Sequence, residues 1–353
     1  MIVRNAFAYP LKRRLDIGVK GGMIVAMDEV VREAADEELD VFGSLVLPPF
    51  VNPNLELDEK AVRKAGVEEV LLSAVKKSVV NGITYVKVRV EVGSKSDFKA
   101  VLRVAEGIQR IASVVLSVDI AAMNNDCSKH RLVRYVALNL DQGDEELLEK
   151  ALELSARMNV GLDVHFSGKS VAALEAMLER VASARKPPRV LLNAPLEGFS
   201  KLSEEALATA KSVGAFLVVK RNYCCDFGAL RRLRESGLDV CLASTTSCGS
   251  YFEQYDPLEV ALCAARSLGT SALEWIADCL TFSGAKALSV ASYGMREGCE
   301  ASFCVLDATN LAEAVRKRAV RTYVFRKGEL VAKSDPPFFL IHHGGLRFEE
   351  VVP

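Results

Sequence analysis

The sequence is poor in the side chains that dominate many metal and aromatic binding sites. Its 353 residues include four histidines and one tryptophan, and aromatic residues make up 7%. Long apolar runs are also missing, since no segment approaches the roughly 20 uninterrupted apolar residues of a membrane-spanning helix. The first ten residues lack the basic and then apolar order of a signal peptide. We therefore expect a soluble, cytoplasmic protein without a membrane partner.

An excess of charge of either sign is absent as well. Basic residues number 45 and acidic residues 46, so the formal net charge is -1. Without a global positive field, neither nucleic acid nor an anionic lipid surface is an expected partner. The nine cysteines are an odd number and follow no spacing of a small disulfide scaffold. We expect free thiols in a reducing compartment.

What the sequence does contain is a regular alternation of short apolar strands and longer helical patterns. The hydrophobic fraction of 50% can fill a large core. Each strand except the third has a helical pattern after it, which predicts a parallel (β/α)8 barrel of the TIM type rather than an open sheet. The predicted strands lie near residues 51–58, 85–92, 113–120, 133–140, 160–165, 189–193, 215–220 and 239–243, and the main helices near 62–80, 97–111, 144–158, 171–184, 204–212, 229–236 and 258–268.

Both ends of the chain show a different pattern, in which short apolar strands are separated by glycine turns. This pattern covers residues 1–43 and returns at 301–307 and 320–331. Neither terminal segment can bury much apolar surface alone. We therefore predict one composite β-sandwich domain from residues 1–47 and 298–353, and a barrel domain from residues 48–297.

The opening strand of the predicted barrel carries the most informative polar residues. Residues 47–51 read Leu-Pro-Pro-Phe-Val, and residues 54–58 read Asn-Leu-Glu-Leu-Asp. Side chains two apart on a strand share a face, so Asn54 and Glu56 point to the same side. A carboxylate that points into a barrel is costly unless it is paired. We expect an ion pair between Glu56 and Lys87, Arg89 or Lys220.

These motifs resemble those of the metal-dependent amidohydrolases, especially the cytosine deaminase branch. In that family the first barrel strand opens with Leu-Pro-Gly-Phe-Val and ends in His-x-His-Leu-Asp. Residues 15–24 are similar to the family's sandwich strands, residues 82–87 to its second barrel strand and residues 298–308 to its return to the sandwich. The resemblance implies a barrel with a composite sandwich. It also implies a zinc or iron ion whose bound water attacks a carbon–nitrogen bond.

At most of the positions that carry this chemistry in the family, the chain differs, and of the five metal-ligand positions only His165 is unchanged. Amide and hydroxyl oxygens are weak neutral ligands, and one carboxylate with one imidazole makes a poor zinc site. The resemblance therefore predicts a vestigial site without a cofactor; if one divalent zinc or iron ion did bind, Glu56 and His165 would be its ligands. The family's metal ligands correspond to Asn54, Glu56, His165, Asn193 and Thr245, its proton-shuttling glutamate to Gly168, and its substrate-binding glutamine to Asn125.

Two functions follow from this reading. The favoured hypothesis is a pseudoenzyme of the amidohydrolase superfamily that binds a small heterocycle or acts as a structural or regulatory subunit, in a homo-oligomer or beside a related subunit. The alternative is a hydrolase of non-peptide carbon–nitrogen bonds with an altered site built on Glu56, His165 and Cys248. Whether the loop cysteines form a thiol or metal site is left open; these are Cys127, Cys224, Cys225 and Cys248.

Overall fold

The main body of the molecule is a parallel barrel of eight strands. A computed structural model describes residues 1–57, 59–90, 95–123, 130–142, 145–167, 171–220, 227–244, 255–334, 338–341 and 348–351. In the barrel, spatial order follows sequence order, and neighbouring strands are parallel throughout. The sheet curls into a nearly closed barrel, as predicted. Its strands are β6 (Phe50–Glu56), β7 (Ile83–Val90), β8 (Ser113–Asp119), β9 (Val133–Asn139), β10 (Gly161–His165), β11 (Val190–Pro195), β12 (Phe216–Lys220) and β13 (Asp239–Leu242).

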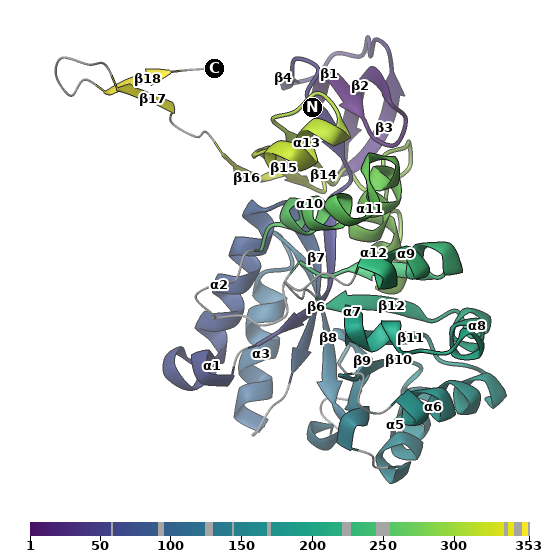
Figure 1. Cartoon of the computed structure of the whole chain (residues 1–353). Helices are drawn as coiled ribbons and strands as arrows, with labels where there is room; N and C mark the ends of the chain where they lie inside the picture. Colours follow the sequence, from purple (N-terminus) through teal and green to yellow (C-terminus); the bar gives the residue numbers. More distant parts are fainter. Residues whose placement is uncertain are drawn as a thin grey trace.

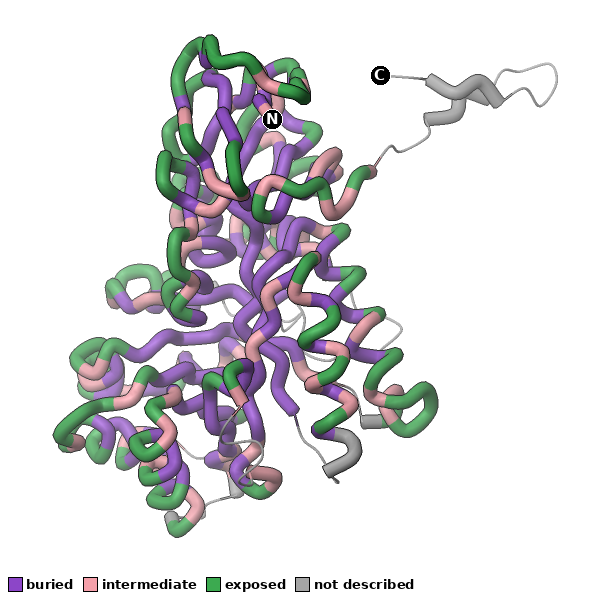
Figure 2. Tube along the Cα trace, turned by 180° about the vertical axis from the view of Figure 1, so that it is seen from behind, coloured by how far each residue is buried: buried purple, intermediate pink, exposed green. Residues whose placement is uncertain are grey.

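Amphipathic helices cover the outside of the barrel. Figure 2 shows the strands buried in the middle of the body and the helices exposed on their outer sides. The predicted helix at 62–80 is divided in the structure, because Gly66 has a φ of 85° and ends the helical path between α1 and α2. The helices are α1 (Glu59–Ala65), α2 (Val67–Val80), α3 (Lys95–Gly107), α5 (Glu145–Met158), α6 (Val171–Ser183), α7 (Leu196–Ser200), α8 (Glu204–Ser212), α9 (Phe227–Ser236), α10 (Pro257–Leu268), α11 (Leu273–Leu280), α12 (Phe282–Ala287) and α13 (Leu311–Lys317).

A second sheet is built from both ends of the chain, as the terminal strand patterns predicted. This mixed sheet has the order β16-β15-β14-β5-β1-β2-β3, with β4 paired to β1, and lies at one end of the barrel (Figure 1). The residue limits of the two domains stay predictions. Its strands are β1 (Ile2–Ala8), β2 (Arg13–Lys20), β3 (Met23–Asp28), β4 (Glu38–Asp40), β5 (Leu45–Leu47), β14 (Phe303–Leu306), β15 (Arg321–Arg326) and β16 (Glu329–Lys333), while β17 (Phe338–Ile341) and β18 (Phe348–Val351) pair as a separate sheet.

Among the described residues, none of the helices combines the length and the apolar character that a membrane crossing requires.

Candidate functional site

Strand β6 delivers two polar side chains to the inside of the barrel by means of an irregular step. Asn52 lies opposite Val86, and Leu55 lies opposite Val88, so β6 uses three residues where β7 uses two. Pro53 falls in this bulge, where a residue without an N–H group costs least. The side chain of Asn54 is fully buried and its amide donates to Glu56 Oε1 over 3.4 Å. The two side chains therefore share the inward side, as predicted.

Glu56 lies at the centre of a small charged cluster near the carboxyl ends of the strands. Lys220 Nζ, from the end of β12, donates to Glu56 Oε1 at 2.6 Å. His165 Nδ1, from the end of β10, lies 3.1 Å from the same oxygen, without hydrogen-bond alignment. The predicted ion pair of Glu56 thus forms with Lys220, whereas Lys87 pairs elsewhere.

Beneath this cluster lies a fully buried pair of opposite charges. Lys87 Nζ on β7 donates to Asp163 Oδ1 on β10, and neither side chain is exposed to solvent. The amide of Asn193 on β11 donates to the same carboxylate oxygen at 2.6 Å. His165 Nε2 lies 3.3 Å from Asp163 Oδ2. His165 therefore stands between two carboxylates, that of Glu56 on one side and that of Asp163 on the other.

The surroundings hold both carboxylates in the ionised form. Burial by itself raises the pKa of Glu56, but His165 and Lys220 more than offset it, and the pKa lies well below its usual range. For Asp163 burial is likewise outweighed by Lys87 and His165, so its pKa is also held well below the ordinary value. Burial lowers the pKa of Lys87, against the opposing attraction of Asp163.

This arrangement has a consequence for stability in acid. Both carboxyl groups have lower pKa values in the folded protein than the roughly 3.9 (Asp) and 4.3 (Glu) of an unfolded chain. Their contribution is complete above those unfolded values and is lost as the pH falls through the folded pKa values, because the unfolded chain binds more protons. We expect the free energy of unfolding, measured with urea, to fall below about pH 5. Glu56→Gln should make the free energy of unfolding decline less steeply with falling pH. The same decline in the wild type and the variant would contradict this prediction.

A second ion pair lies on the neighbouring strands. Arg89 on β7 contacts Asp119 on β8 over 3.0 Å, and the Asp119 side chain also caps the short 3-10 turn at Ile120–Ala122. Of the three basic partners considered for Glu56, Lys87 and Arg89 thus have carboxylates of their own.

Sequence reasoning missed Asp163, although a signal was present. Asp163 stands two residues before His165 in an otherwise apolar strand, so strand alternation places it on the same inward face. A buried carboxylate there requires a cation, and Lys87 occupies a similar position in the run Val-Lys-Val of β7.

Several polar atoms of this region are buried without a hydrogen bond from the described residues. Each is shielded from solvent, and in folded proteins such atoms are uncommon. Many lie around the cluster just described: Asn54 Oδ1, Asp163 Oδ2, both ring nitrogens of His165, Asn193 Oδ1, and Ser244 Oγ after β13.

Other predicted site residues lie outside the described part of the chain. They are Asn125, Gly168 and Thr245, together with the loop cysteines Cys127, Cys224, Cys225 and Cys248. Among the residues that the structure does describe, no group of three or more histidine, cysteine, aspartate or glutamate side chains is arranged to hold a metal ion.

A nearly closed parallel barrel with a sheet built from both termini is the fold of the amidohydrolases. N-isopropylammelide isopropylaminohydrolase from Burkholderia multivorans has a similar structure, with a TM-score of 0.82 and 19% identity over 94% of this chain and 98% of that one. 5-Methylcytosine deaminase from Klebsiella pneumoniae, liganded with 5-fluorocytosine, has a TM-score of 0.76 and 18% identity over 96% and 99%.

In sequence, the chain is similar to N-isopropylammelide isopropyl amidohydrolase from Pseudomonas sp. (strain ADP). The two are 21% identical over 95% of this chain and 98% of the relative. No protein-family model matches the sequence. At these levels of identity the likeness establishes the fold, and the chemistry must be argued from the site.

Proposed function

We propose that this chain is a cytosine deaminase-like member of the amidohydrolase superfamily whose barrel mouth binds a small ring compound without metal-dependent hydrolysis. The fold and the nearly full-length similarity to the Pseudomonas amidohydrolase support the superfamily assignment. The observation that carries the loss of hydrolysis is the contact of the Lys220 ammonium with Glu56. A role as a structural or regulatory subunit, beside a second copy or a related chain, stays a prediction.

The donor set argues against a bound divalent metal. Glu56 is the carboxylate nearest to His165 at the mouth, and the lysine ammonium that lies 2.6 Å from its oxygen already supplies the compensating charge. A dication at the same place would be repelled by this ammonium. Of the remaining oxygens, those of Asp163 belong to a carboxylate whose charge Lys87 already compensates, and those of Asn54 and Asn193 are neutral amide ligands, which suit zinc and iron poorly. The described residues therefore do not fit the family's metal.

The same residues suit the amide edge of a ring compound. The Glu56 side chain is 27% exposed and the Lys220 side chain 19% exposed, so part of each group is accessible at the mouth. A carboxylate accepts hydrogen bonds and an ammonium donates them. Side by side, they complement a ring that presents an N–H group next to a carbonyl, as cytosine does. Such charge-assisted hydrogen bonds are stronger than neutral ones.

This proposal predicts binding without turnover. In calorimetric titrations of the protein with cytosine and with N-isopropylammelide, at least one should bind saturably, and neither should release ammonia or isopropylamine. Glu56→Gln and Lys220→Met should each weaken binding about tenfold or more, because each removes a charge-assisted hydrogen bond of about 1.5–3 kcal/mol. Glu37→Gln, at an exposed position immediately before β4, is the matched control and should bind normally.

The metal content tests the second part of the proposal, the absence of metal-dependent hydrolysis. Protein purified without chelator should contain far less than one equivalent of zinc or iron by plasma mass spectrometry. A stoichiometric metal together with release of ammonia or isopropylamine would contradict the proposal.

One contact favours a second candidate, a hydrolase of non-peptide carbon–nitrogen bonds. His165 Nδ1 lies 3.1 Å from Glu56 Oε1, within the distance at which a carboxylate can orient an imidazole that acts as a base. If the chain is such an enzyme, Glu56→Gln and His165→Ala will each abolish turnover and leave the fold intact. Turnover that survives both substitutions would exclude this candidate.

A further inference from the structure

A cavity in the described part of the chain lies at the opposite end of the barrel from Glu56. Its volume is about 690 Å³, within the range of about 300–1,000 Å³ that is typical of small-molecule sites. Arg134 and Gly161 stand near the amino ends of β9 and β10, and Arg189 immediately precedes β11. The candidate site described above lies instead at the carboxyl ends of the strands. The two regions are therefore separate.

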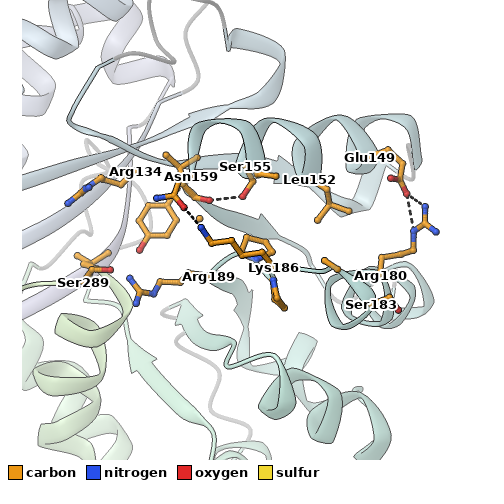
Figure 3. A pocket seen from close by; sticks show the side chains of 18 residues that line it. Arg134, Glu149, Leu152, Ser155, Asn159, Arg180, Ser183, Lys186, Arg189 and Ser289 are labelled. Atoms are coloured by element: carbon orange, nitrogen blue, oxygen red, sulfur yellow. Dashed lines mark hydrogen bonds and ion pairs between the residues drawn. The ribbon is translucent and has the colours of Figure 1, made fainter.

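The cavity is positive although the whole chain is not. Four basic side chains line it, from Arg134, Arg180, Lys186 and Arg189, against a single carboxylate, Glu149. Glu149 is already paired with Arg180. Figure 3 shows this pair at one end of the cavity, with Arg134, Arg189 and Ser289 gathered at the other end. Positive charge is thus concentrated away from the only carboxylate of the lining.

The two arginines at that end are available for an anion. Neither Arg134 nor Arg189 forms an ion pair with a carboxylate of the described residues, although Arg189 lies over the ring of Phe216 at 5.9 Å. Both residues are exposed, and both act electrostatically on the buried hydroxyl of Tyr135. Planar guanidinium groups bind phosphate and carboxylate through paired hydrogen bonds. Lys186, whose ammonium donates to Asn159 Oδ1 at 3.0 Å, adds a third positive charge.

The rest of the lining combines an apolar wall with four polar side chains, Ser155, Asn159, Ser183 and Ser289. The wall consists of aliphatic, proline and tyrosine side chains, and the backbone of Gly161 approaches the Tyr135 ring so closely that an added Cβ would lie 2.5 Å from it. A flat or aliphatic ring fits such a wall, and proline limits its movement. The apolar lining residues are Tyr135, Leu152, Ala156, Val160, Ala184, Pro187, Pro188 and Leu288.

We infer that this cavity is a second binding site, for an organic anion of nucleotide size in which a ring system carries a phosphate or diphosphate group. The anionic group lies against Arg134 and Arg189, with Lys186 nearby, and the ring lies against the apolar wall. This inference does not depend on the proposed function, because it concerns the other end of the barrel. If the test of this inference fails, the proposed function is unaffected, and the reverse also holds.

The test is a calorimetric titration with three probes at fixed ionic strength. ADP should bind saturably, inorganic pyrophosphate about tenfold or more weakly, and adenosine not measurably. Raising the salt from 0.05 M to 0.5 M should weaken ADP binding, since accessible charges are screened. Absence of saturable ADP binding at millimolar concentration would overturn the inference. Pyrophosphate that binds as tightly as ADP would overturn the part played by the apolar wall.

Variants locate the binding. Arg134→Gln should weaken ADP binding at least tenfold, and Arg134→Gln combined with Arg189→Gln should abolish it. The Arg134→Gln single variant is needed because Arg189 also packs over Phe216, so the double variant could lose packing as well as charge. Thermal unfolding of the single and the double variant is compared with that of the wild type. Arg131→Gln, an exposed arginine three residues away that does not line the cavity, should bind ADP normally. Unchanged ADP binding in the Arg134 variant would refute the inference.

Discussion

Replacing Lys87 by methionine is expected to lower the free energy of unfolding by about 3–5 kcal/mol, the usual cost of removing one partner of a buried ion pair. Lys87 and Asp163 have no solvent exposure, so water cannot replace the missing ammonium. Asn193 still donates to Asp163, but an amide dipole compensates a buried charge only in part. Urea unfolding at pH 7 measures the change.

A double-mutant cycle separates the interaction energy between Lys87 and Asp163 from the effect of losing each side chain by itself. Lys87→Met together with Asp163→Asn removes both charges, so the double variant should be less destabilised than the sum of the single variants. An exposed control is Arg103→Met, whose ion pair with Glu68 lies on the surface and should contribute at most about 1 kcal/mol. Additive effects of the two buried substitutions would show that the charges do not interact.

The second large effect is expected from Gly161→Ala. An added Cβ would lie 2.5 Å from the Tyr135 ring and 2.9 Å from the backbone oxygen of Arg189. Backbone cannot rotate away, and the buried hydroxyl of Tyr135 is held by the carbonyl of Ala287. Overpacking of this kind costs typically about 1–3 kcal/mol, which should be visible as a lower midpoint in thermal and urea unfolding.

A second glycine provides the control for this substitution. Gly107, at the end of α3, has no atom within 4 Å of an added Cβ and no positive φ. Gly107→Ala should therefore leave stability unchanged or raise it by up to about 1 kcal/mol, because alanine restricts the unfolded chain. Equal losses of stability in Gly161→Ala and Gly107→Ala would mean that the close packing around Gly161 does not cause the destabilisation. Loss of ADP binding in Gly161→Ala would further connect this packing with the cavity.

The charged side chains around Glu56 and Asp163 also explain why the site was harder to predict than the fold. Strand alternation correctly placed Asn54 and Glu56 on one face, and it limited the partners of Glu56 to three basic residues. It did not choose among them. That choice depends on which strand ends approach each other across the barrel, and β12 brings Lys220 to Glu56 while β10 brings Asp163 to Lys87.

The sequence alone determined the elements and their order, because the periods of apolar residues, 2 for strands and 3.6 for helices, are local properties. It therefore indicated the eight barrel strands and the sheet shared by both termini. Only the tertiary structure decided which charges meet, since Lys220 and Glu56 are 164 residues apart and Lys87 and Asp163 are 76 apart. The basic cavity at the amino ends of β9 and β10 arises in the same way. Its arginines are ordinary exposed residues in the sequence, and they become a site because the closing barrel brings neighbouring strand ends together.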